Sequence, residues 1–213
     1  MDGICMHNNM TDSIKKYLGN SYFTYNGNDL YNKPCLIAMK PGIGLIVFIV
    51  KHWYENEVID LNNDVFYIKQ DNVIERIHLS DETHSLQFKI SNHIKAALGR
   101  HPAITTFVCL ANISRAFIDT KFSDNTKGYY VLTKEDLSDH DQFLNKIESM
   151  AIVPGHSIYE PLTPLIINQV KCLFNDSPDK LDSQHVIHCY SIFAYIPDTL
   201  SDWKAVLSQL VDS

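Results

Sequence analysis

The segment from Lys33 to Trp53 carries the clearest hydrophobic pattern of the chain. Two nearly continuous apolar runs flank Pro41-Gly42-Ile43-Gly44, whose composition is typical of a turn, and Lys51 is the lone charge near the end of the second run. Strands that are apolar on both faces belong in a sheet covered by helices rather than on a half-solvated surface. The pattern therefore predicts a buried hairpin in an α/β domain.

The pattern changes after Trp53. Val58–Asp60, Val65–Lys69 and Val73–Leu79 alternate between apolar and polar positions around Asn- and Asp-rich turns, which predicts a small meander. A helix should follow, with Asp81 or Thr83 as its cap and Gly99 at its end. Its apolar stripe consists of Leu86, Ile90, Ile94, Ala97 and Leu98.

The remaining segments continue an α/β order. Buried strands are expected at Thr105–Leu110 and Tyr129–Thr133, and helical spacing is present in Gln142–Met150 and Leu162–Phe174. The polar stretch Asn175–Gln184 is the best linker candidate. Along the chain it is followed by His185–Ile196 and by an expected helix at Leu200–Val211. We therefore expect one domain over residues 1–175 and a C-terminal extension over 176–213.

The hairpin and the segments after it resemble the nuclease-related (NERD) domain of the PD-(D/E)XK nuclease superfamily. The residues on matching positions are Pro34, Pro41, Gly44, Val50, Lys51 and Trp53. The similarity extends over roughly Tyr22 to Phe174, and Gln87 falls in the first turn of the expected helix, where the family has a glutamine. The resemblance implies a mixed β-sheet flanked by helices, with a small helical extension at the C-terminus.

The same alignment places Cys35 at the family's metal-binding Asp and Ile49 at its Glu, so both acids are missing. Mg²⁺ prefers oxygen ligands, whereas the Cys35 thiol is a soft ligand and Ile49 cannot coordinate a metal. Lys51 and Gln87 are then what remains of the family's site. We expect no metal, no cofactor and no nuclease activity, unless Glu55, Glu57 or Asp60 supplies a displaced acid and restores an Mg²⁺ site.

Charge and composition narrow the class of protein. The 213 residues carry a net charge of −7, so the surface as a whole gains little attraction to a polyanion. A local binding patch is conceivable from Lys51, His52, Lys89, Lys95, Arg100 and His101, although lysines on the wet face of a helix are the simpler interpretation. His52 is a candidate base, but without a metal it is weak evidence for hydrolysis.

The cysteines and the apolar runs suggest where the protein works. The five cysteines are scattered along the sequence, which indicates buried, unpaired residues of a protein in a reducing compartment. The spacing of Cys189, His185 and His188 is poor for a zinc site. No apolar run reaches transmembrane length and the first residues do not form a signal peptide, which predicts a cytoplasmic protein.

The favoured hypothesis is therefore a catalytically inactive, nuclease-like subunit. It would act as a scaffold or regulator of a partner nuclease or helicase in DNA transactions, such as defence against phage or plasmid DNA. Because the chain has no GxxxxGK[ST] phosphate loop, any motor must be another polypeptide. Two alternatives remain open: a metal-dependent DNA nuclease with displaced acids, and a DNA-binding module.

Overall fold

The computed structural model describes residues 3–27, 31, 33–62, 64–70, 73–120, 129–151 and 162–175. The chain divides into two units, Met1–Phe174 and Asn175–Ser213. Apart from Asn175, the expected linker, the His185–Ile196 segment and the last helix lie outside the described residues. The proposed boundary at 175/176 and the role of the extension stay predictions.

A five-stranded mixed sheet forms the centre of the first unit, in the order β1-β2-β3-β7-β8. Its strands are β1 (Phe23–Asn26), β2 (Cys35–Lys40), β3 (Gly44–Tyr54), β7 (Ile104–Asn112) and β8 (Tyr130–Thr133). β1, β2 and β3 are antiparallel neighbours, whereas β3, β7 and β8 run parallel. The predicted hairpin is confirmed. Its turn needs glycine, since Gly42 and Gly44 have φ angles of 79° and 109°.

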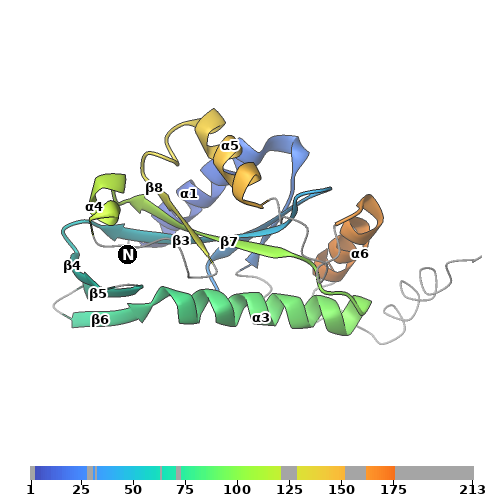
Figure 1. Cartoon of the computed structure of the whole chain (residues 1–213), viewed down its shortest axis with the longest axis horizontal. Helices are drawn as coiled ribbons and strands as arrows, with labels where there is room; N and C mark the ends of the chain where they lie inside the picture. Colours follow the sequence, from blue (N-terminus) through green and yellow to red (C-terminus); the bar gives the residue numbers. More distant parts are fainter. Residues whose placement is uncertain are drawn as a thin grey trace, which may run out of the picture. The chain divides into compact units, whose positions relative to one another are not determined.

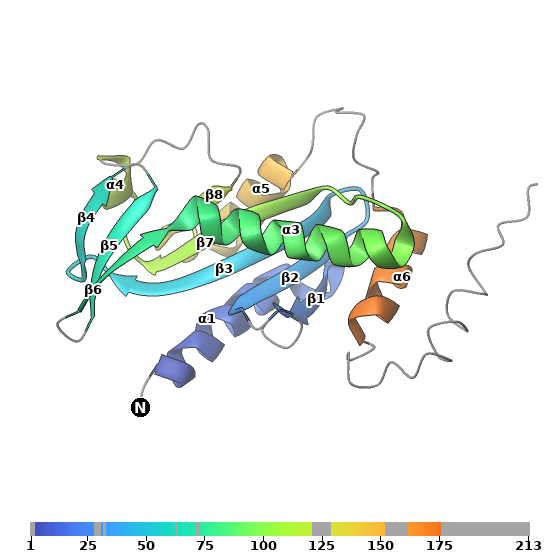
Figure 2. The same ribbon diagram turned by 90° about the horizontal axis from the view of Figure 1, so that it is seen from below.

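Helices cover both faces of this sheet (Figures 1 and 2). α1 (Gly3–Leu18) and α5 (His140–Ala151) pack on one face, where Phe48, Phe107 and Phe143 form the centre of the core. α3 (Leu79–Leu98) and α6 (Pro164–Asn175) pack on the other, against the odd-numbered residues of β2 and β3. The mixed α+β fold with a sheet flanked by helices is thus confirmed. A 3-10 turn (Gly19–Ser21) and the short α4 (Arg115–Asp119) complete the described elements.

The predicted meander forms a second, antiparallel sheet of β4 (Val58–Asn62), β5 (Val65–Gln70) and β6 (Val73–His78). It packs at the end of β3, where Trp53 and Phe66 lie with ring centroids 5.1 Å apart. Trp53 is buried. This contact fixes the small sheet beside the carboxyl end of the central strand.

The start of α3 differs from the prediction. β6 runs directly into the helix at Leu79, whose N–H donates to the carbonyl of Asp64, and the Ser80 hydroxyl donates to the Asp64 carboxylate. Thr83 already lies inside the helix and donates to the carbonyl of Ser80, so the expected caps at Asp81 or Thr83 were wrong. Gly99 ends α3 in the left-handed conformation, as predicted.

Candidate functional site

The register of the hairpin brings together three positions that are separated in the sequence. Cys35 and Ile49 are direct partners across β2 and β3. Because strand residues two apart share a face, Lys51 lies next to Ile49 on the side covered by α3. We call these three residues the lysine site. It is located where the resemblance places a metal, two acids and a lysine.

Two of the three residues are sealed in an apolar interior. Cys35 is 4% exposed and Ile49 is 2% exposed, and both belong to the core formed with Leu86, Ile90 and Ile94 of α3. Burial raises the pKa of the Cys35 thiol to about 12, so it is a neutral thiol rather than a thiolate ligand at physiological pH. No group of three or more His, Cys, Asp or Glu side chains among the described residues could hold a metal ion.

The third residue has a carboxylate partner that sequence reasoning missed. Lys51 Nζ donates to Glu82 Oε2 of α3 at 2.6 Å, and the two side chains are only 14% and 20% exposed. The ammonium group also lies 5.2 Å from the centre of the Trp53 ring. Lys51 is therefore not a solvated lysine at a strand end but half of a largely buried ion pair.

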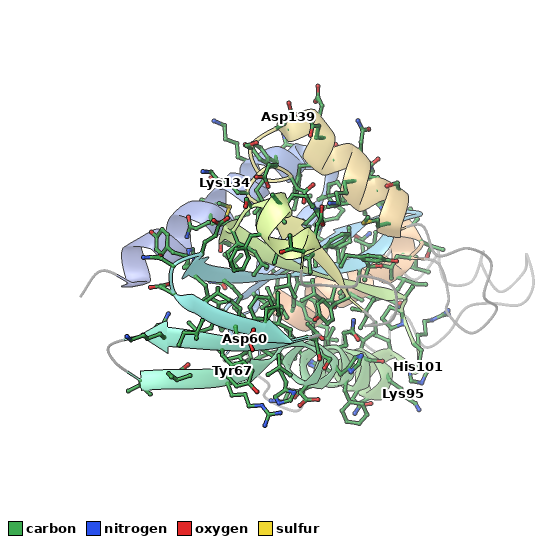
Figure 3. The ribbon with its side chains drawn as sticks, turned by 60° about the vertical axis from the view of Figure 1, so that its left-hand side comes forward. Asp60, Tyr67, Lys95, His101, Lys134 and Asp139 are labelled. Atoms are coloured by element: carbon green, nitrogen blue, oxygen red, sulfur yellow. The ribbon has the colours of Figure 1, made fainter. Side chains whose placement is uncertain are left out.

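The acids proposed as displaced ligands have other contacts. Glu55 accepts from the backbone N–H of Ser114, and Glu57 accepts from that of Tyr54. Asp60 lies exposed on β4 and accepts from the N–H of Leu61 (Figure 3). The carboxylate beside Lys51 is Glu82 and not one of the three acids considered from the sequence.

Gln87 lies in the third turn of α3, not the first as predicted, because the helix begins earlier. Its Nε2 donates to Thr106 Oγ1 of β7 at 2.8 Å, and Thr106 is buried. This bond gives the buried Thr106 hydroxyl a hydrogen-bond partner. Gln87 thus joins α3 to β7 and is half-buried rather than exposed.

The basic residues of the expected patch do not gather at the lysine site. Lys89 and Lys95 are exposed on α3, and Lys95 follows Glu82 by thirteen positions, which is about 20 Å along the helix. Lys95 and His101 lie near the far end of α3, and Arg100 follows that end (Figure 3). His52 lies where the register of β3 against β7 shifts, and its carbonyl accepts from the Asn112 side chain.

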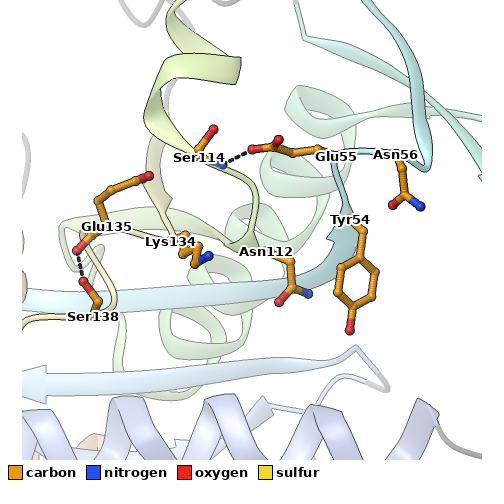
Figure 4. Close-up of a pocket in the computed structure, with 8 residues that line it drawn as sticks. All are labelled: Tyr54, Glu55, Asn56, Asn112, Ser114, Lys134, Glu135 and Ser138. Atoms are coloured by element: carbon orange, nitrogen blue, oxygen red, sulfur yellow. Dashed lines mark hydrogen bonds between the residues drawn. The ribbon is translucent and has the colours of Figure 1, made fainter.

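A second candidate lies at the carboxyl ends of the parallel strands β3, β7 and β8, the edge at which α/β sheets commonly bind ligands. A polar hollow of about 580 Å³ opens there (Figure 4). It is lined by Tyr54, Glu55, Asn56, Asn112, Ser114, Lys134, Glu135 and Ser138.

The two carboxylates of this hollow already have structural partners. Glu55 accepts from the N–H of Ser114 at 2.7 Å, and Glu135 accepts from the N–H of Arg115 at 2.8 Å. Hydrogen bonding from the Ser114 side chain, and then from its N–H, lowers the pKa of Glu55. Burial raises the pKa of Glu135, but backbone N–H groups and the Thr133 hydroxyl outweigh it and lower the pKa. Both side chains are therefore ionised and stabilise the first N–H groups of α4.

No family model, curated protein or solved structure matches the chain. Among the described helices, none is long and apolar enough to cross a membrane. The nuclease-like interpretation therefore depends on the residue pattern around Lys51 and on the geometry of the lysine site. Of the two candidates, the lysine site is the one whose three positions the sequence singled out and the fold brings together.

Proposed function

We propose that this chain is a nuclease-like domain without nuclease activity that serves as a scaffold or regulatory subunit for a partner nuclease or helicase. The observation that carries the proposal is the composition of the lysine site. Cys35 and Ile49 pair across β2 and β3 beside Lys51 but lie in an apolar core, and Lys51 is bound to Glu82. The partner's involvement in DNA transactions comes from the resemblance alone.

The chemistry of phosphodiester hydrolysis explains why this composition favours a non-catalytic role. A hydrolytic Mg²⁺ must be held by oxygen ligands and must polarise both the phosphate and the attacking water. A neutral thiol and an isoleucine supply no such ligand. A lysine already neutralised by a carboxylate at 2.6 Å has little charge left to stabilise a developing anion.

A cleavage assay tests the loss of activity. Purified protein in excess over labelled plasmid, linear and single-stranded DNA is incubated with Mg²⁺ or Mn²⁺, beside the Lys51→Ala variant. We expect no cleavage above the background shared with Lys51→Ala. Cleavage that the wild-type protein performs and Lys51→Ala does not would overturn the proposal.

A separate experiment tests the role as a subunit. The tagged full chain is expressed at its natural level in its own cells and recovered under native conditions, and the mass of the complex is measured. We expect a defined nuclease or helicase at fixed stoichiometry. Recovery of a monomer alone would contradict the scaffold role even if the protein cleaves no DNA.

One observation favours a second candidate, a nuclease with a displaced acid. Glu82 places a carboxylate within hydrogen-bond distance of Lys51, so one oxygen ligand is present beside the lysine. The candidate requires DNA cleavage that is lost in both Glu82→Gln and Lys51→Ala. Cleavage that persists in both variants would identify a contaminant instead.

A further inference from the structure

The outer side of α3 presents an unusual aromatic side chain. Phe88 is 67% exposed, which is the largest exposure of any bulky hydrophobic side chain among the described residues. The opposite side of the same helix buries Leu86, Ile90 and Ile94 against the sheet, so the fold does not need Phe88. In Figure 1, α3 is the layer below the sheet, and its outer side faces away from the strands. Phe88 is therefore a surface feature rather than a misplaced core residue.

A hollow of about 350 Å³ adjoins Phe88. Its walls are one stripe of α3 and the segment that leads into β7, and its lining residues are His84, Gln87, Phe88, Ser91, Pro102, Ala103 and Ile104. The apolar part of the wall comes from Phe88 and the residues before β7, and the rim is polar. An aromatic anchor inside a polar rim is the usual composition of a binding hot spot.

The charge around this hollow differs from that of the whole chain. The protein has a net charge of −7, yet no residue from Thr83 to Ile118 is acidic. Lys95 follows Phe88 by seven positions, which places it two turns further along nearly the same side of the helix. Lys89 flanks Phe88, and both lysines are exposed. At the other end of this stripe, seven positions before Phe88, lies Asp81, whose side chain is 81% exposed.

We propose that the Phe88 surface, formed by His84, Phe88, Ser91, Lys95 and Pro102–Ile104, docks an acidic segment of a partner protein. An apolar side chain of that segment fills the hollow beside Phe88, and its carboxylates lie against Lys95 and Lys89. The inference rests on the proposed scaffold function and names the chemistry of the partner. The exposed Asp81 determines how the segment lies along α3. Because Asp81 repels carboxylates, the acidic residues of the segment must lie toward the Lys95 end.

The same features fit a nucleic acid less well. Binding to a phosphate backbone needs several cations along the track, and each neutralised phosphate steepens the salt dependence. The stripe offers Lys95 with Lys89 beside it, and Asp81 at its start would repel phosphate. The negative charge of the whole chain also opposes the long-range attraction of a polyanion. A short acidic peptide needs fewer charges and uses the apolar hollow.

Selection from a random twelve-residue peptide display library tests the proposal on the full-length protein. Peptides are selected on the wild type and depleted on Phe88→Ala. We expect enriched peptides in which one bulky apolar residue is flanked by Asp or Glu. No enrichment, or enriched peptides without acidic residues, would overturn the proposal.

Affinities of the enriched peptide for matched variants complete the test. Phe88→Ala should weaken binding at least about tenfold, and Lys95→Glu about fivefold or more. The controls Ile59→Ala and Lys69→Glu change an exposed apolar and an exposed basic residue on the small sheet and should leave affinity unchanged. If Ile59→Ala weakened peptide binding as much as Phe88→Ala, or Lys69→Glu as much as Lys95→Glu, the proposal of a defined site would be contradicted.

A single-stranded oligonucleotide serves as the competing probe. Tight, salt-dependent binding that Phe88→Ala and Lys95→Glu both weaken, with no peptide selected, would mean that the surface binds nucleic acid and that the proposal is wrong. These measurements require no cleavage activity and no natural complex. Their failure is thus distinguishable from failure of the proposed function, which the cleavage and recovery experiments decide.

Discussion

Lys51 Nζ donates to Glu82 Oε2 across 2.6 Å and so joins the central strand β3 to the first turn of α3. The two residues are separated by 31 positions, and both are mostly buried. In an active site, a lysine at the end of a buried strand would face substrate and metal. Here it has a carboxylate partner on α3. The pair therefore gives Lys51 a structural role that can be measured apart from any activity.

Removing one member of this pair should destabilise the fold more than removing both. Glu82→Gln leaves the Lys51 ammonium group poorly paired, and we expect a loss of about 2 kcal/mol in the free energy of unfolding. Combining it with Lys51→Met should recover part of that loss. Urea unfolding of the two single variants and the double variant measures the coupling energy. A coupling near zero would show that the ion pair has no structural role.

Placing an acid at the position of Ile49 should destabilise the protein in a way that depends on pH. A carboxyl at this position would lie in the apolar core beside Lys51, whose charge is already paired with Glu82, and it would therefore have a raised pKa in the folded state. Its destabilising effect is then smallest below the ordinary glutamate pKa of about 4.3 and grows as pH rises toward the raised value. Urea unfolding of Ile49→Glu at pH 5 and pH 8 tests this, with Ile49→Val as the control. Equal stability of Ile49→Glu and Ile49→Val at pH 8 would mean that water already reaches the lysine site.

The cysteines should differ in their reactivity toward alkylating reagents. Cys35 and Cys109 are buried, and burial raises the pKa of both thiols. Cys172 is exposed on α6, so the expectation that all five cysteines are buried is wrong for this residue. Iodoacetamide should modify Cys172 in the native protein and reach Cys35 and Cys109 only after unfolding. Peptide mass spectrometry with and without urea measures the extent of modification of each cysteine. Native modification of Cys35 at the rate of Cys172 would show that the lysine site is open.

Asp136 should contribute stability that acid removes. It accepts from Lys146 at 2.8 Å and from Arg115 at 2.5 Å, and so connects the turn after β8 with α5 and α4. Burial raises the pKa of Asp136, but the bonds from Lys146 and the Thr133 N–H, with the charges of Lys146 and Arg115, outweigh it and lower the pKa. The stabilisation is fully present above the ordinary aspartate pKa of about 3.9 and is lost as pH falls through the lowered value.

Asp136→Asn should therefore cost about 3 kcal/mol near neutral pH, because it removes the carboxylate charge that Lys146 and Arg115 share. The difference from the wild type should shrink as pH falls below about 4. Thermal unfolding between pH 3 and pH 7 measures it, with the exposed Asp12→Asn as the control. A difference that stays constant over this range would show that the charge of Asp136 is not what stabilises the turn.

The elements of the fold were predictable where local pattern determines them. The apolar runs on either side of Gly42 and Gly44 predict a buried hairpin. The stripe of Leu86, Ile90, Ile94, Ala97 and Leu98 favours a helix with one buried side. The start of α3 was not predictable in this way. It depends on the carbonyl of Asp64, which accepts from Leu79 only after the meander has folded.

The partner of Lys51 could not be predicted for the same reason, because it depends on where α3 begins. A buried lysine requires a carboxylate partner. The acids nearest in sequence, Glu55 and Glu57, instead accept hydrogen bonds from backbone N–H groups. Glu82 reaches Lys51 because α3 begins at Leu79 and crosses the sheet under β3. The sequence did contain one signal for this partner, namely an acid in the first turn of the helix that covers β3. Recognising it required the correct helix start.

Titration of Mn²⁺ into the purified chain, followed by electron paramagnetic resonance, tests the central claim that the lysine site has no place for a catalytic metal. The account predicts that the signal of free Mn²⁺ rises in proportion to the amount added over the micromolar range, equally for the wild type, Glu82→Gln and Lys51→Ala. Stoichiometric uptake of Mn²⁺ by the wild type that Glu82→Gln abolishes would contradict it.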